Sequence, residues 1–126
     1  MKREILLLDE NGTLFVPTDT SHIAMTEYEI AELFGAITPT VRAAIKAVYR
    51  SGMIREEDAK RYLRTANENI IEVYSLETIV ALAFRVDSSG ADKVREYLFR
   101  TLRANRRSAV HFLLPCSRNA GITIPN

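Results

Sequence analysis

Apolar and polar positions follow one another along this chain in blocks that predict a hairpin and several helices. The segment EILLLDENGTLFV at 4–16 has two apolar runs around an acidic, glycine-containing turn, which predicts a β-hairpin. Branched and aromatic side chains at 70–74 predict another strand, which we expect to pair with this hairpin. Residues 55–64, just before that strand, predict a short polar helix. Its inward-facing residues are expected to be Ala59, Tyr62 and Leu63.

The segment MTEYEIAELFGAITPTVRAAIKAVYRSG predicts two helices joined by a tight turn. Thr26 is placed to cap the first helix, and Glu29 to reach back to the cap in a capping box. Gly35 permits a left-handed turn, and Ile37 is expected to fill the angle between the helices. Thr38 is the expected N-cap of the second helix. The expected buried stripes are Ile30, Leu33 and Phe34, then Val41, Ile45 and Val48.

Two helices joined in this way are typical of DNA-binding modules, although ordinary helical hairpins share the pattern. Because a helix turns by about 100° per residue, the outward side of the second helix can be read from its sequence. Its first turns would meet base edges in a major groove, and bases further along would reach phosphates. The predicted contacts with double-stranded DNA are Thr38, Thr40, Arg42, Ala43, Lys46 and Arg50.

The remainder of the chain predicts two more helices. Ser75 is expected to cap a helix over 76–86. Arg85 near its end either makes a functional contact or, as we expect, forms a buried ion pair with an acid. The pattern VREYLFRTLRANRR predicts a last helix whose basic residues are either solvated or a second phosphate-contacting surface. The expected fold class is therefore α+β: a winged helix-turn-helix-like domain with an N-terminal β-hairpin and C-terminal helices.

Length and charge refine this picture. A chain of 126 residues, 47% of them hydrophobic, is the size of one compact domain. Its net charge of +1 argues against a strongly basic nucleic-acid-binding surface. Residues 1–40, however, contain two basic and seven acidic residues, whereas residues 41–126 contain fifteen basic and nine acidic residues. The basic part begins with the proposed recognition helix, where a local field can attract phosphate.

Other kinds of chemistry find little support in the sequence. The single cysteine, Cys116, excludes an internal disulfide, and with only His22 and His111 beside it there is no plausible zinc spacing. No nucleophile and base arrangement and no glycine-rich phosphate loop is recognisable, so we expect neither an enzyme, nor a cofactor, nor a small-molecule substrate. Without a long apolar run or a signal-like start, we expect a cytoplasmic protein and no membrane partner.

Three blocks, in this order, add a resemblance. The first is AMTEYEIAELFG followed by TPTVRAAIK, and the second is VYSLETIVALAFRVDS. The third is Val94, Arg95 and Tyr97, where the family that the chain resembles has a phenylalanine, an arginine and a tryptophan. With these blocks the chain resembles the RhuM family, proteins of bacterial genomic islands often described as virulence or DNA-binding proteins. The resemblance covers roughly residues 4–107.

The resemblance implies a DNA-binding protein that regulates transcription in a mobile element or virulence island, and its motifs establish no enzymatic activity. This chain departs from the family at two places. Glu27 and Glu29 follow the initial threonine where glutamines are common, and they would repel phosphate. Ala43, Ala44 and Ala47 stand where polar or basic residues are usual. The alternative is therefore a protein-interaction or dimerisation module whose helix-turn-helix no longer binds DNA.

The expected domain organisation follows from the extent of the resemblance. Residues 1–107 are expected to form the helix-turn-helix domain, and residues 108–126 a C-terminal extension. The apolar run at 110–114 is too short to cross a membrane, so it would pack on its own domain or on a second subunit. A homodimer would suit DNA recognition, because two copies can contact two half-sites.

Overall fold

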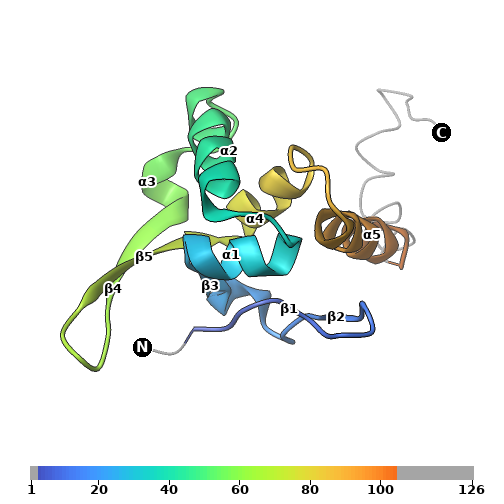
Figure 1. Cartoon of the computed structure of the whole chain (residues 1–126), viewed down its shortest axis with the longest axis horizontal. Helices are drawn as coiled ribbons and strands as arrows, with labels where there is room; N and C mark the ends of the chain where they lie inside the picture. Colours follow the sequence, from blue (N-terminus) through green and yellow to red (C-terminus); the bar gives the residue numbers. More distant parts are fainter. Residues whose placement is uncertain (1–2, 105–126) are drawn as a thin grey trace, which may run out of the picture. The chain divides into compact units, whose positions relative to one another are not determined.

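The computed structural model describes residues 3–104, and the chain divides into two compact units, residues 1–95 and residues 96–126. The first unit contains both β-sheets and most of the helices (Figure 1). Helix α5 (Ser89–Ala104) begins in the first unit and ends in the second. The fold of the described residues belongs to the predicted α+β class. The expected extension at 108–126 and its boundary lie outside the described residues, so both stay predictions.

The N-terminal segment forms the predicted β-hairpin. Strand β1 (Leu7–Leu8) pairs antiparallel with β2 (Leu14–Phe15). The Asp9 carboxylate stabilises the turn by accepting backbone hydrogen bonds from the residues two and four positions further on, at 2.9 and 2.8 Å. These two strands form a sheet of their own. The expected pairing with the strand at 70–74 is therefore wrong.

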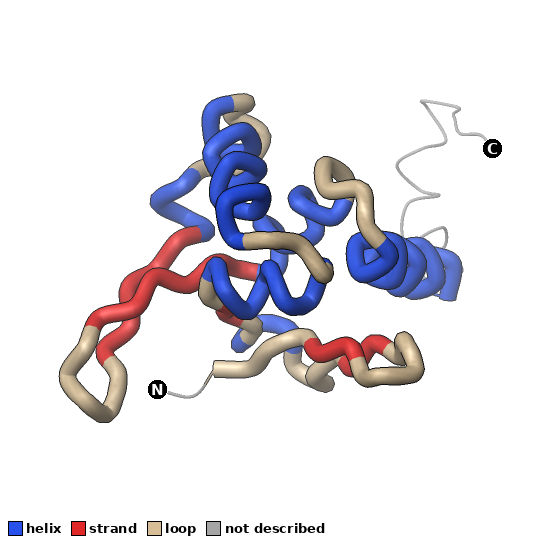
Figure 2. Tube along the Cα trace, viewed as in Figure 1, coloured by secondary structure: helices blue, strands red, loops and turns tan. Residues whose placement is uncertain are grey.

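A separate three-stranded antiparallel sheet consists of β3 (Ala24–Met25), β4 (Lys60–Arg64) and β5 (Ile70–Ser75) (Figure 2). Its order is β3-β5-β4, so β5 lies in the centre. Strand β3 pairs with β5 in place of the expected hairpin. Both residues of β3 are buried in the core. The hairpin instead leaves Leu7 and Phe15 more than half exposed.

The polar segment at 55–64 is mostly strand, where we expected a helix. Helix α3 (Glu56–Ala59) is a single turn, and β4 begins directly after it. Of the residues expected to face inward, Ala59 is buried but Tyr62 is 62% exposed. The prediction fails because each residue of β4 pairs with one of β5, as Tyr62 does with Glu72, and this pairing overrides the local helical preference.

Helices α1 (Glu27–Phe34) and α2 (Thr38–Arg50) are the predicted pair. The capping box is present: Thr26 Oγ1 accepts from the Glu29 N–H at 3.1 Å, and the Glu29 carboxylate accepts from the Thr26 N–H at 2.9 Å. Gly35 ends α1 in the left-handed region, with φ of 69°. The expected stripes are all buried: Ile30, Leu33 and Phe34 in α1, and Val41, Ile45 and Val48 in α2.

The turn between these helices differs in detail from the prediction. Ile37 does not fill the angle between them, since it is 68% exposed, and half-buried Ala36 packs against the core instead. Ile37 is also the N-cap of α2, which makes Thr38 the first helical residue. Ile37 forms no side-chain cap hydrogen bond. Pro39 in the first turn favours the helix start all the same, because its ring presets φ and it has no N–H to satisfy.

Arg3 adds an ion pair to the capping box. Its guanidinium donates to the Glu29 carboxylate at 2.8 and 3.0 Å and to the Ala24 carbonyl at 3.0 Å. Burial raises the pKa of Glu29, but hydrogen bonds from Arg3 and Thr26 outweigh it, so the pKa of this carboxyl lies below its ordinary value. The ionised Glu29 therefore stabilises the fold above the unfolded-state pKa, and this contribution disappears as the pH falls through the folded-state pKa.

Glu29→Gln is expected to lower the free energy of unfolding by about 1 kcal/mol near neutral pH, because the amide cannot form the ion pair with Arg3. The difference between the variant and the wild type should shrink below about pH 4, where the wild-type carboxylate also becomes protonated. Urea unfolding of both proteins across this pH range measures the effect. A difference that does not change with pH would contradict the assigned ion pair.

Helix α4 (Leu76–Ala83) follows β5 directly, and Ser75 precedes it without a side-chain cap hydrogen bond. The helix ends three residues earlier than predicted, which leaves Arg85 in an exposed turn. The buried ion pair expected for Arg85 is therefore wrong. Arg95 is the arginine bound near this helix end, where its guanidinium donates to the Ala83 carbonyl and pairs with an acid of its own helix.

The core of the first unit contains residues from α1, α2, α4, the beginning of α5 and the central sheet. Its largest fully buried side chains include Phe34, Ile23, Met25, Ile30, Ile79 and Leu82. At Gly90, helix α5 contacts the backbone at the end of α1. A Cβ atom there would lie 2.2 Å from the Leu33 carbonyl oxygen and 2.7 Å from the Phe34 Cα. Only glycine permits so close an approach.

Candidate nucleic-acid interface

The outer side of α2 carries the residues predicted to contact DNA. Thr38, at the start of the helix, is half-buried. The other five predicted residues are exposed: Thr40, Arg42, Ala43, Lys46 and Arg50. The three basic residues among them are four positions apart, and this spacing places them along one side of the helix.

Arg42 is held by an acid from the preceding helix. Its Nη2 donates to Glu27 Oε1 at 2.8 Å, and its Nε lies 3.2 Å from each oxygen of the same carboxylate. The side chain of Arg42 is 55% exposed and that of Glu27 is 25% exposed. Hydrogen bonding to Glu27 raises the pKa of Arg42. The charge of Arg42 is thus balanced within the protein, which the sequence alone did not indicate.

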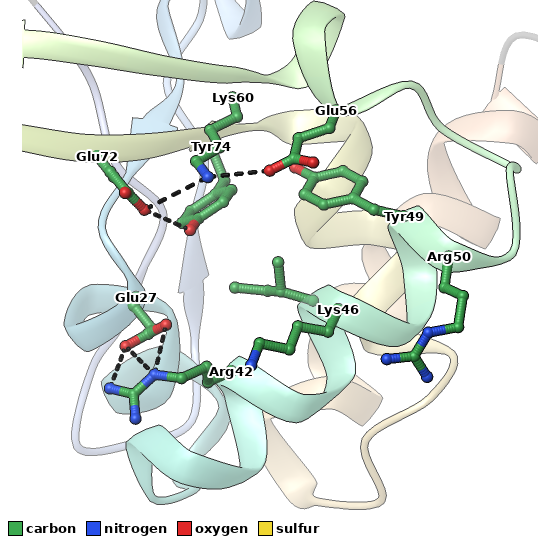
Figure 3. A pocket seen from close by; sticks show the side chains of 10 residues that line it. Glu27, Arg42, Lys46, Tyr49, Arg50, Glu56, Lys60, Glu72 and Tyr74 are labelled. Carbon is green, nitrogen blue, oxygen red and sulfur yellow. Dashed lines mark hydrogen bonds and ion pairs between the residues drawn. The ribbon is translucent and has the colours of Figure 1, made fainter.

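Lys46 and Arg50 lie further along the same side of α2. Within residues 3–104 neither side chain has a hydrogen-bond or ion-pair partner, and Figure 3 shows both extending from the helix. Their positive charges are therefore balanced by no bound acid of the described chain. An exposed cation of this kind remains available to an anionic partner such as a phosphate.

A cleft of about 500 Å³ borders this side of α2 (Figure 3). Its walls come from the start of α1, from α2 and α3, and from strands β4 and β5. It is lined by Glu27, Arg42, Ile45, Lys46, Tyr49, Arg50, Glu56, Lys60, Glu72 and Tyr74. Each of its three acids lies within ion-pair distance of a cation of the same cleft. The cleft therefore presents no excess of negative charge to a partner bound on α2.

The wall of the cleft opposite α2 is a polar network centred on Lys60. Its ammonium lies 2.9 Å from Glu56 and 3.8 Å from Glu72. The Tyr74 hydroxyl donates to Glu72 at 3.0 Å. On the α2 side of the cleft, the Tyr49 hydroxyl shares a hydrogen bond of 2.9 Å with Thr78 of α4. The hydrogen bond to Glu56 raises the pKa of Lys60. The pKa of Tyr74 is raised mainly by burial, and also by the hydrogen bond to Glu72. Near neutral pH Lys60 is charged and Tyr74 is protonated.

Strands β4 and β5 form a hairpin that projects from the rest of the first unit (Figure 1). Arg61, Tyr62 and Arg64 are exposed on β4. Arg64 forms an exposed ion pair with Glu68 in the turn at 3.2 Å, and the Lys60 ammonium lies 5.7 Å from the centre of the Tyr62 ring. The hairpin thus carries additional basic residues beyond the cleft.

The sequence interpretation missed the residues that face α2 across the cleft. Lys60, Glu72 and Tyr74 come from the antiparallel pair, and Glu27 comes from the first position of α1. The strand at 70–74 was predicted, but KRYLR at 60–64 does not alternate between polar and apolar residues and was interpreted as the end of a polar helix. The contacts across the cleft depend on tertiary structure and have no local signal.

Comparisons with protein-family models, with curated proteins and with solved structures give no match to this chain. In the part of the chain that the structure describes, no cluster of histidine, cysteine and acidic residues could bind a metal ion. In the same part, none of the helices is both long and apolar enough to cross a bilayer.

Proposed function

We propose that residues 1–95 bind double-stranded DNA through the outer side of α2. The observation that carries this proposal is the pair of exposed side chains, Lys46 and Arg50, without an acidic partner among the described residues. The Gly35 turn fixes the angle at which α2 leaves α1. Lysine and arginine bind phosphate by displacing condensed counterions, so two such residues on one helix side suit a duplex backbone.

The order of the elements supports a winged helix-turn-helix as the finer description of this α+β fold. The chain runs β3–α1–α2–β4–β5, and the strands assemble in the order β3-β5-β4. Helices α1 and α2 would form the helix-turn-helix, and the β4–β5 hairpin would form the wing. Arg61 on the exposed part of β4 would then provide a second contact with the DNA backbone.

The regulatory role and the assembly are parts of the same proposal that depend on the resemblance to the RhuM family. They comprise transcriptional regulation in a mobile element or virulence island, a cytoplasmic location and a homodimer. In a homodimer, two copies of α2 would occupy half-sites about one helical turn of DNA apart.

Binding of the full chain to a fluorescent duplex is expected to weaken steeply with salt. Two phosphate contacts per copy, from Lys46 and Arg50, predict a log–log slope of about −1.8, which is roughly a tenfold loss of affinity between about 50 and 200 mM salt. A homodimer would double this slope to about −3.6. Fluorescence anisotropy over a salt series measures it.

The salt series also tests the alternative function, a protein-interaction module. A helix side rich in small residues, with Ala43 exposed on it, can pack against another helix. An interface of that kind depends on apolar burial and responds little to salt. Absence of duplex binding even at low salt, with self-association that salt leaves unchanged, would contradict the DNA-binding proposal and favour this alternative.

A further inference from the structure

The Arg42 guanidinium has one edge bound within the protein and one edge with a nitrogen that has no hydrogen-bond partner among the described residues. Glu27 binds the edge formed by Nε and Nη2. The Nη1 atom has no hydrogen-bond partner within residues 3–104, and Figure 3 shows it directed away from the Glu27 carboxylate. The edge formed by Nη1 and Nη2 therefore keeps N–H donors that a ligand can use.

The Arg42–Glu27 pair joins the two helices of the proposed DNA-binding module. Glu27 is the first residue of α1, where the helix dipole stabilises its negative charge, and Arg42 is the fifth residue of α2. The carboxylate is the more buried partner, so it restrains a long side chain whose outer end remains in solvent. An arginine restrained in this way loses less conformational freedom on binding than a free one.

The charge of the pair distinguishes two kinds of ligand. A phosphate is attracted by net positive charge, and the adjacent Glu27 carboxylate cancels that attraction at Arg42. The edge of a base is neutral and is bound by the direction of its hydrogen bonds. Guanine presents two acceptors in the major groove, O6 and N7, at the spacing of two parallel N–H donors of an arginine. Early positions of a recognition helix are those that contact bases.

We propose that Arg42 recognises a guanine in the major groove and that Glu27 is a positioning residue that holds it for this contact. This inference rests on the proposed function and assigns separate roles within it. Arg42 provides sequence preference, whereas Lys46 and Arg50 provide affinity that is independent of sequence.

The test uses the full chain and begins with selection of preferred duplexes from a library with a randomised core. Each guanine of the selected site is then replaced by 7-deazaguanine, which lacks the N7 acceptor, or by adenine. At one position the adenine replacement is expected to weaken wild-type binding by about 5- to 150-fold, with a smaller loss for 7-deazaguanine. Arg42→Ala should show no preference at that position, because the donor edge is gone.

Glu27→Gln provides the readout for positioning. This variant should bind random-sequence duplexes at least as tightly as the wild type, because a negative charge is lost, but its preference for guanine should fall by about tenfold. The exposed pair Arg55–Glu57, also with an N–O distance of 2.8 Å, offers a matched control. Glu57→Gln is expected to leave the preference unchanged. Thermal melting confirms that every variant is folded.

Three results would overturn the inference in distinguishable ways. If the penalty for replacing guanine persists in Arg42→Ala, another residue recognises that base. If Glu27→Gln binds every duplex more tightly and keeps its guanine preference, Glu27 merely screens charge and does not position Arg42. If the wild type binds no duplex at low salt, the proposed function itself fails.

Discussion

Replacing Lys46 and Arg50 together by glutamine should reduce the affinity for duplex DNA by about 30- to 10⁴-fold. Each lost phosphate contact costs about 1–3 kcal/mol, and separate contacts add approximately. The log–log salt slope should become less steep by about two for each copy bound. Glutamine is a suitable replacement because it forms helices nearly as well as lysine and arginine, and both positions are exposed.

Arg85→Gln is the matched control for this pair of substitutions. Arg85 is exposed in the turn after α4 and does not line the cleft beside α2, yet its replacement removes the same charge as either single substitution. Loss of charge alone would weaken binding equally in Arg85→Gln and Lys46→Gln. Unchanged affinity and salt slope in the folded double variant would show that α2 does not contact the backbone. Anisotropy titrations at several salt concentrations provide both quantities.

Gly90→Ala should destabilise the first unit by about 3 kcal/mol, although alanine is by itself the better helix former by about 1 kcal/mol. The added Cβ would lie 2.2 Å from the Leu33 carbonyl oxygen and 2.9 Å from the Phe34 carbonyl carbon. Both are backbone atoms, so no side-chain rotation relieves the overlap. Helix α5 would have to move away from the end of α1, which would expose part of the core beneath it.

The loss of stability at Gly90 can be measured by thermal melting. A loss of about 3 kcal/mol corresponds to a decrease in Tm of roughly 10–20 °C for a unit of this size. Ser89→Ala is the control, because Ser89 precedes Gly90 in the same helix and is exposed. A Tm for Gly90→Ala within the range of this control would mean that α5 does not pack closely on α1.

Local signals explain the parts of the fold that the sequence predicted correctly. The capping box between Thr26 and Glu29 and the turn at Gly35 each depend on residues only a few positions apart. The same holds for the hairpin turn at Asp9, whose carboxylate binds N–H groups within four residues. These interactions join residues close together in the chain, so the residue types at those positions could predict them. The same kind of signal failed at Thr38 and Ser75, which do not cap the helices that follow them.

The incorrect predictions with the largest effect on the fold concern contacts between distant parts of the chain. Strand β3, and not the hairpin, pairs with β5, and both of its residues are buried in the core. No local pattern in the sequence shows which strand pairs with β5. Residues 60–64 become a strand only because β5 is available to pair with them. Arg85 was assigned to a helix that ends before reaching it, and Arg95 makes the contact near that end.

The candidate site shows the same division between local and tertiary information. Helical periodicity correctly placed Thr40, Ala43, Lys46 and Arg50 on an exposed side of α2. It could not show that Arg42 is bound by Glu27, because fifteen residues and a turn separate the two. The sequence suggested that Glu27 and Glu29 would both repel phosphate. In the structure the first binds Arg42 and the second binds Arg3.

Each side of the cleft beside α2 is restrained by contacts of its own. On one side the Tyr49 hydroxyl hydrogen-bonds Thr78, which ties α2 to α4. On the other side Lys60 and Tyr74 share the acid Glu72 within the β4–β5 pair. The centres of the Tyr49 and Tyr74 rings lie 6.4 Å apart. Both surfaces proposed to contact DNA, the outer side of α2 and the hairpin, are therefore restrained before a duplex binds. A duplex that contacts both surfaces would have to adapt its groove width to them. Stiff and pliable DNA sequences would differ in the free-energy cost of this deformation.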